Sequence, residues 1–158
     1  MEPVNTAVLA GCGGFLLAVL WMDLIFDVQV LAHRGAGAQL PEPVLSSIAA
    51  YYHRATTTAR PMNRLIAAVM LVLLAALGFR AARGADPPWW TVSCLLLAGV
   101  PIGLAAVHTV PSAVRLGTRG DDLAGQSKLA RGICRDHLVC GAGLAAFLVL
   151  VLIRAGVA

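Results

Sequence analysis

The chain has 158 residues, so a single domain is expected. Its residues are 59% hydrophobic and 13% charged, against about 25% charged in a typical soluble domain, which excludes an ordinary soluble protein and indicates an integral membrane protein. The net charge of +4 does not indicate a nucleic-acid partner, because the basic residues cluster at the ends of apolar runs, as topology signals do.

Four apolar segments, at about residues 6–26, 62–79, 89–107 and 138–153, are each close to the roughly 20 residues that cross a bilayer. Spanning segments must satisfy their own backbone in lipid, and these show no period of two, so they indicate helices rather than a barrel. We predict an all-α fold, an integral membrane four-helix bundle in one domain. Its helices are expected at about residues 6–30, 62–80, 88–109 and 130–154.

The first helix ends in a stretch from Trp21 to Arg34 that carries two carboxylates, Asp23 and Asp27. Four residues apart, they share one helix face. A charge near the centre of a membrane helix costs about 2.5–3.5 kcal/mol, so a lipid-facing position without compensation is disfavoured. We expect a functional role for the deeper Asp23, and an ion pair with Arg64 or Arg135 for Asp27.

Small residues line another face of the first helix at spacings of four, three and four. This spacing allows a neighbouring backbone to approach closely. We expect helix packing there, and a homo-oligomer through the Gly11/Gly14 face is an open possibility. The residues of this face are Ala7, Gly11, Gly14 and Ala18.

A separate amphipathic segment, expected to be helical at about residues 43–55, precedes the second apolar run. It forms either a helix at the membrane surface or an extension of the second helix kinked at Pro61. Asn63 lies at the mouth of the second helix. The residues on the apolar face of the amphipathic segment are Leu45, Ile48, Ala49 and Tyr52.

The third helix should begin after Pro87 and Pro88, kink at Pro101 and end near residues 108–111. The fourth should begin before its membrane part, near Asp122, and an interfacial extension is expected there. Its inward stripe carries His137.

Basic residues are distributed unequally between the two ends of the predicted helices. The positive-inside rule therefore places both long loops in the cytoplasm and both termini outside the plasma (inner) membrane. The side of the loops holds Arg34, Arg54, Arg60, Arg64, Arg115, Arg119, Lys128, Arg131 and Arg135, and the opposite side holds Arg80, Arg83 and Arg154.

All four histidines fall on the predicted cytoplasmic side, which makes it the place for chemistry. His108 and His137 with Asp23 or Asp27 would form a set of two histidines and one carboxylate, a type used by non-haem iron. Iron or copper is therefore a candidate cofactor, and haem b held by two of His53, His108 and His137 is a less favoured one. Asp23, Asp27, Tyr52 and Asn63 are the candidate catalytic and substrate-orienting residues.

The layout resembles the anthrone oxygenase-like family of small four-helix membrane proteins. The resemblance is carried by the small-residue start of the first helix, by Pro61-Met62-Asn63-Arg64, and by Thr109-Val110-Pro111 before a polar helix leading to His137. It implies oxidation of a lipophilic aromatic or quinone-like molecule.

The leading hypothesis is a membrane-embedded redox or oxygenase-like protein that acts on a lipophilic small molecule at a polar His/Asp site. Convergent polar residues within apolar helices favour it. The alternatives are a non-catalytic membrane subunit or ligand-binding bundle, and a haem b carrier.

Overall fold

The computed structural model describes residues 2–35, 39–84 and 86–157, and these hold helices and no strand, which confirms the all-α prediction. In chain order the elements are α1 (Glu2–Asp27), the 3-10 helix η1 (Val28–His33), α2 (Glu42–Thr57), α3 (Arg60–Arg83), α4 (Pro88–Leu104), the π-helix η2 (Ala105–Thr109), α5 (Val110–Thr118) and α6 (Leu123–Val157).

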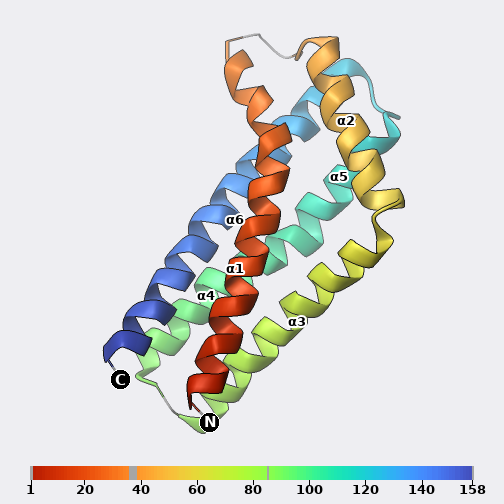
Figure 1. Cartoon of the computed structure of the whole chain (residues 1–158). Helices are drawn as coiled ribbons and strands as arrows, with labels where there is room; N and C mark the ends of the chain where they lie inside the picture. The colour runs from red at the N-terminus through yellow and green to blue at the C-terminus, as the bar shows by residue number, and fades with distance from the viewer. Residues whose placement is uncertain (1, 36–38, 85, 158) are drawn as a thin grey trace.

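Four helical stretches in the described ranges are long and apolar enough to cross a membrane, as expected from the sequence. They are Val4–His33, Arg60–Arg83, Pro88–Thr118 and Leu123–Gly156. The two chain ends lie at the same end of the molecule, and α6 runs alongside α1 and α4 (Figure 1).

Proline and left-handed residues set several of the helix boundaries. Pro61 and Pro88 each occupy the first turn of a helix that follows non-helical residues, where the missing N–H loses no intrahelical hydrogen bond. Gly84 ends α3 with a φ of 59°, a conformation that glycine adopts without strain. Of the two alternatives for the segment before Pro61, a separate helix or a kinked extension of the second helix, the structure has a separate helix, because a turn at residues 58–59 divides α2 from α3.

The third apolar helix runs further than the sequence prediction, which ended it near residues 108–111. The chain stays helical through η2 and α5 to Thr118. Pro111 has no N–H to bond the carbonyl four residues back, and the wider turn of η2 precedes it, with the Val110 amide reaching Ala105 O. Pro111 therefore begins α5 instead of ending the helical stretch.

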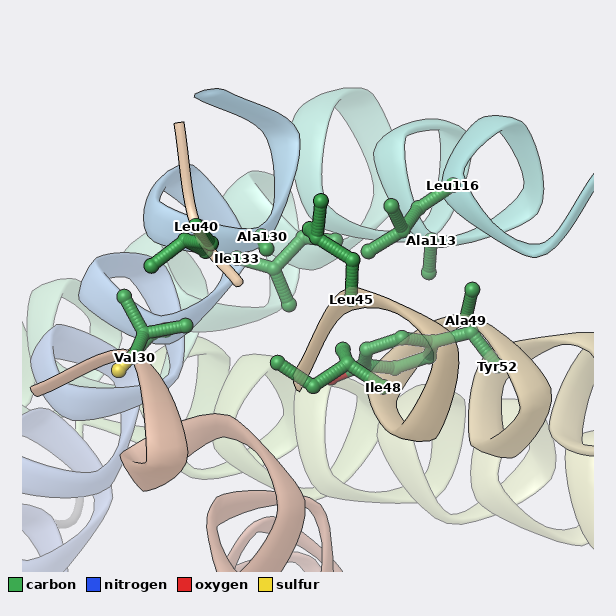
Figure 2. Close-up of a cluster of buried hydrophobic side chains, with 11 residues drawn as sticks. Val30, Leu40, Leu45, Ile48, Ala49, Tyr52, Ala113, Leu116, Ala130 and Ile133 are labelled. Carbon is green, nitrogen blue, oxygen red and sulfur yellow. The ribbon is translucent and has the colours of Figure 1, made fainter. Parts of the chain in front are cut away.

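The buried residues form two hydrophobic clusters along the length of the molecule. The first joins α1, α3, α4 and α6 through Leu9, Leu16, Leu73, Leu77, Trp90, Cys94, Ala98, Leu144, Phe147 and Val151. The second joins η1, α2, α5 and α6 through Val30, Leu40, Leu45, Ile48, Ala49, Tyr52, Ala113, Leu116, Ala130, Ile133 and Cys134 (Figure 2).

The predicted apolar face of α2 is confirmed, but its partner is protein. Leu45, Ile48 and Tyr52 are buried, and Figure 2 shows Leu45 and Ala49 on the side of α2 that faces Ala113 and Leu116 of α5. The two backbones approach closely at Gly117, where an added Cβ would lie 2.9 Å from the His53 backbone nitrogen. α2 therefore uses its apolar face to hold α5, and not to lie on a lipid surface.

The face that α1 turns to α6 is different from the predicted small-residue face. An added Cβ at Gly13 would lie 3.0 Å from Phe147 and Leu148, whereas at Gly11 or Gly14 it would meet no described atom within 4 Å. Gly13 is thus the glycine of α1 at which α6 approaches closely. The prediction that the Gly11/Gly14 face packs in the fold of one chain is wrong, and its role in an oligomer stays a prediction.

Candidate functional site

A buried carboxylate lies between the two hydrophobic clusters, at the end of α1. The side chain of Asp27 is 0% exposed. Its Oδ1 accepts a hydrogen bond of 2.7 Å from the Tyr52 hydroxyl, and its Oδ2 lies 2.6 Å from His137 Nδ1. These contacts join α1, α2 and α6 at one point and satisfy both oxygens of the carboxylate.

A second carboxylate faces the other nitrogen of the same imidazole. Asp23 Oδ2 lies 4.0 Å from His137 Nε2, and Asp23 Oδ1 accepts a hydrogen bond of 2.5 Å from the Tyr51 hydroxyl. The Asp23 side chain is 19% exposed, so this end of the network is the accessible one. The ring of Tyr51 stacks on Phe26, with centroids 4.1 Å apart.

The local sequence explains how two pairs of side chains meet. Asp23 and Asp27 stand one helical turn apart on α1, so they point the same way. Tyr51 and Tyr52 are consecutive on α2, and their rings meet edge-on at 67°. Consecutive residues of a helix point about 100° apart, so each tyrosine reaches a different carboxylate.

A second polar cluster is centred on Asp136, the residue that precedes His137 on α6. Asp136 is buried, and its Oδ2 lies 2.5 Å from His108 Nδ1 and accepts a bond of 3.3 Å from the Thr109 hydroxyl. Its Oδ1 accepts a bond of 3.0 Å from Arg135 Nη2. Since Asp136 and His137 are consecutive, α6 carries one polar contact toward η2 and one toward α1.

Burial and the nearby carboxylates keep both tyrosines protonated. Burial, followed by the hydrogen bond to Asp23, raises the pKa of Tyr51 well above its usual range. Burial, together with the negative charge of Asp27, raises the pKa of Tyr52 further. Both phenols are therefore hydrogen-bond donors at neutral pH.

Four of the residues singled out from the sequence meet in this network: Asp23, Asp27, Tyr52 and His137. Asn63 lies elsewhere, because it is exposed and its Nδ2 donates a bond of 2.8 Å to Ala55 O. This contact links α3 to the end of α2. The side chain of Asn63 is thus engaged away from His137 and is not placed to orient a substrate there.

The proposed ligand set of His108, His137 and Asp23 is not assembled. His108 contacts Asp136 on the η2 side of α6, whereas His137 turns toward α1. Within the ranges that the structure describes, no group of three or more His, Cys, Asp or Glu side chains is placed to hold a metal ion. The prediction assumed that histidines at the same end of the molecule bind one metal ion. His108 and His137 lie on different helices and contact different carboxylates.

The expected arginine partner of Asp27 is also corrected. Its contacts are Tyr52 and His137, and Arg135 bonds Asp136 instead. The reason is orientation, because Asp27 points inward and the side chain of Arg135 is 71% exposed. Two members of the site, Tyr51 and Asp136, were missed, although each adjoins in sequence a residue that was predicted.

The arrangement is suited to moving a proton. A carboxylate on Nδ1 fixes the orientation and tautomer of the His137 ring and leaves Nε2 toward Asp23. An imidazole held in this way serves as a general acid or base near neutral pH. The His137 ring thus lies between two carboxylates. It contacts the buried Asp27 through Nδ1, and its Nε2 faces the more accessible Asp23 at 4.0 Å, so a group that binds and releases protons stands between them.

Comparisons with models of known families, with curated proteins and with solved structures found no match to this chain. The resemblance to the anthrone oxygenase-like family therefore stays a prediction. The class of site is defined here by its geometry: a carboxylate–imidazole–carboxylate network with two tyrosine donors.

Proposed function

We propose that the chain is an integral membrane four-helix bundle whose polar network lies at one boundary of the bilayer. A polar cluster at the opposite end of the molecule, in which Arg80 bonds both Thr6 and Asp86, supports this placement. From Thr6 to Asp27 the helix α1 rises about 32 Å, close to the hydrocarbon thickness of about 30 Å. The two polar clusters would then mark the two faces of the membrane.

Exposed tryptophans are consistent with the same boundaries. Trp89, near Asp86, is 64% exposed, and Trp21, near Asp23, is 71% exposed. Tryptophan is enriched at both membrane–water interfaces. The excess of arginine and lysine beside α2, α5 and the start of α6 orients the network toward the cytoplasm, with both termini outside the plasma membrane.

In this proposal the protein is a redox or oxygenase-like enzyme for a lipophilic small molecule such as a hydroquinone, anthrone or phenol. The observation that carries it is the position of His137 between Asp23 and Asp27. Such substrates lose protons when they are oxidised, and a proton acceptor at the membrane boundary serves them directly. For a hydroquinone, two electrons and two protons pass to dioxygen, which is reduced to hydrogen peroxide as the quinone forms.

Each residue of the network has a defined task. Asp23 receives the substrate proton at the exposed end, with Tyr51 holding its other oxygen. His137 accepts the proton on Nε2, and Asp27 stabilises the imidazolium that results. Tyr52 bonds Asp27, so that this carboxylate keeps its position.

An oxidation assay with the protein in lipid nanodiscs tests the proposal. Decylhydroquinone, anthrone and an alkylphenol are each mixed with air-saturated buffer, and oxygen uptake and product absorbance are followed. We expect His137→Gln and Asp23→Asn to lower the rate about 10²-fold or more, as for a lost general base. Asp121→Asn, which changes a surface pair with the exposed Arg115, is the matched control.

Two results would overturn this function. One is a rate with the native protein equal to that of empty nanodiscs for all three compounds. The other is a native rate that His137→Gln and Asp23→Asn leave unchanged while both variants remain folded by circular dichroism.

A non-catalytic membrane subunit is the second candidate, favoured by the uncovered face at Gly11 and Gly14. An added Cβ at either position meets nothing within 4 Å in the described part of the chain, so the face is open to a second helix. We expect Gly11→Leu to convert a homo-oligomer to a monomer in light scattering of the detergent complex. Gly103→Leu, at another open position, is the control.

A further inference from the structure

A cavity of about 370 Å³ opens between η1 and α6, away from the contacts of His137. Such a volume is within the range of about 300–1,000 Å³ typical of small-ligand sites. Its lining residues come from two antiparallel segments. They are Val30, Leu31 and Arg34 from the continuation of α1, and Arg131, Cys134, Arg135, Leu138 and Val139 from α6.

Apolar and charged residues are separated along this cavity. On α6 the arginines at 131 and 135 come first, and Leu138 and Val139 follow toward the apolar part of the helix. On the facing segment Val30 comes first and Arg34 lies beyond it. Because the two segments run in opposite directions, both place their arginines at the same end of the cavity.

The charges lining the cavity are all positive. Arg34, Arg131 and Arg135 line it, and among the described residues no carboxylate does, although Asp136 bonds Arg135 outside it. Each guanidinium presents several N–H donors in a planar fork that matches phosphate oxygens. The site is therefore complementary to a phosphate group that carries an apolar tail.

The position of the arginines relative to the proposed membrane boundary fits such a ligand. Arg135 and Arg131 precede His137 on α6 by two and six residues, or about 3 and 9 Å along the axis. The headgroup layer occupies about 5–8 Å beyond the hydrocarbon on each side of a bilayer. Arg135 thus lies at headgroup depth and the backbone of Arg131 lies at the outer edge of that layer, within reach of its long side chain, while Leu138 and Val139 lie where acyl chains begin.

We propose that this cavity binds one anionic phospholipid of the cytoplasmic leaflet. Its phosphate lies on Arg34 and Arg131, with Arg135 at the rim, and the start of its acyl chains lies against Leu138 and Val139. Basic pockets between membrane helices on the cytoplasmic side are suited to anionic headgroups. The inference rests on the proposed membrane placement and not on the redox chemistry, so each can fail alone.

Native mass spectrometry of the detergent-solubilised protein with added phosphatidylglycerol or phosphatidylcholine tests the site. We expect one phosphatidylglycerol to be retained in preference to phosphatidylcholine. The double variant Arg34→Gln/Arg131→Gln should weaken this binding about tenfold or more. The double variant Arg54→Gln/Lys128→Gln has the same net charge on the same side but lies outside the cavity, and should change it less than about threefold.

Further measurements distinguish a lipid site from diffuse surface charge and from a soluble-anion site. Arg34→Lys/Arg131→Lys should recover much of the binding, because the positive charge returns. If both glutamine variants weaken binding equally, the attraction is a general effect of surface charge and the site is overturned. If sn-glycerol 3-phosphate, which has no acyl chains, competes as strongly as the lipid, a soluble anion replaces the lipid as the ligand and the proposal is also overturned.

Discussion

His137 of α6 and Asp27 of α1 stand 110 residues apart in the chain, and their side chains meet at 2.6 Å. The carboxylate is fully buried, and its second oxygen bonds Tyr52 of α2. The pair therefore lies where the apolar helices end and the α2–α5 part begins. It connects those two parts of the molecule and also forms the centre of the candidate site.

Removal of Asp27 should destabilise the fold strongly. Asp27→Ala leaves the His137 ring and the Tyr52 hydroxyl buried without this partner, and each buried polar group left without a hydrogen bond costs about 1–3 kcal/mol. Thermal unfolding in detergent, followed by tryptophan fluorescence, measures the change. Asp121→Ala breaks the exposed pair with Arg115 and should cost under about 1 kcal/mol.

A double-mutant cycle shows whether the loss belongs to the pair. Asp27→Ala and His137→Ala together should cost less than the sum of the single changes, because each single change leaves one buried partner unpaired. Additive effects of the two changes would contradict a coupled Asp27–His137 pair.

The two tyrosines should resist deprotonation in the native protein. The chain holds two tyrosines, so the change of absorbance at 295 nm with pH reports Tyr51 and Tyr52, because the three tryptophans add a background that does not titrate. Burial and the carboxylates raise both pKa values, so native absorbance should stay level through about pH 10, where unfolded tyrosine titrates. Because the native pKa values are raised, the stability these phenols contribute is complete below about pH 10 and is lost as pH rises above it.

The matched comparison is the same titration in denaturant, where a transition near about pH 10 is expected. Tyr51→Phe and Tyr52→Phe then assign the native signal. A native transition at the same pH as the denatured one, with unchanged circular dichroism, would contradict the burial of the two hydroxyls beside Asp23 and Asp27.

Close contact between α2 and α5 makes Gly117 intolerant of a side chain. The Cβ of Gly117→Ala would lie 2.9 Å from the His53 backbone nitrogen, and backbone cannot move aside as a flexible side chain can. We expect a loss of about 1–3 kcal/mol, as for other overpacked contacts. Gly103→Ala in α4 meets no described atom within 4 Å and should be neutral or slightly stabilising in the same melting experiment, since alanine favours helix.

Long apolar runs predicted the helices well, because an apolar segment that spans lipid must satisfy its own backbone hydrogen bonds, and a helix does so. Helical spacing also predicted the buried face of α2, where Leu45, Ile48, Ala49 and Tyr52 recur on one side. The continuation of the helix beyond Pro111, to Thr118, was not predicted. Composition alone cannot show that a π-helical turn will carry the helix past the missing N–H.

The candidate site was predicted in part, for a comparable reason. Helical spacing placed Asp23 and Asp27 on one shared face, Tyr52 on the apolar face of its segment and His137 on an inward stripe. These four residues do meet. Spacing does not fix how neighbouring helices are rotated about their own axes. His108 was therefore grouped with His137, although it contacts Asp136 on another side of α6. For the same reason the partner of Asp27 was taken to be an arginine instead of His137.

At the opposite end of the molecule, a cluster around Asp86 links α3, the following loop and α6. Arg80 donates two bonds of 2.7 Å to Asp86, and Arg154 lies 3.4 Å from the same carboxylate. The hydrogen bond from Arg80 is the main cause that lowers the pKa of Asp86 below its usual range. A group with a lowered native pKa contributes stability above its unfolded pKa of about 3.9, and this stability is lost as pH falls through the native value.

Acid should therefore weaken this cluster. The melting temperature of the native protein should fall as the buffer is taken from about one pH unit above the unfolded pKa of aspartate to about one unit below it. Asp86→Asn should melt lower than the native protein at neutral pH and lose part of this acid dependence, because the variant has no carboxylate for Arg80 to hold ionised. Asp121→Asn should keep the dependence. An unchanged acid slope in Asp86→Asn would show that carboxylates elsewhere in the chain cause the loss.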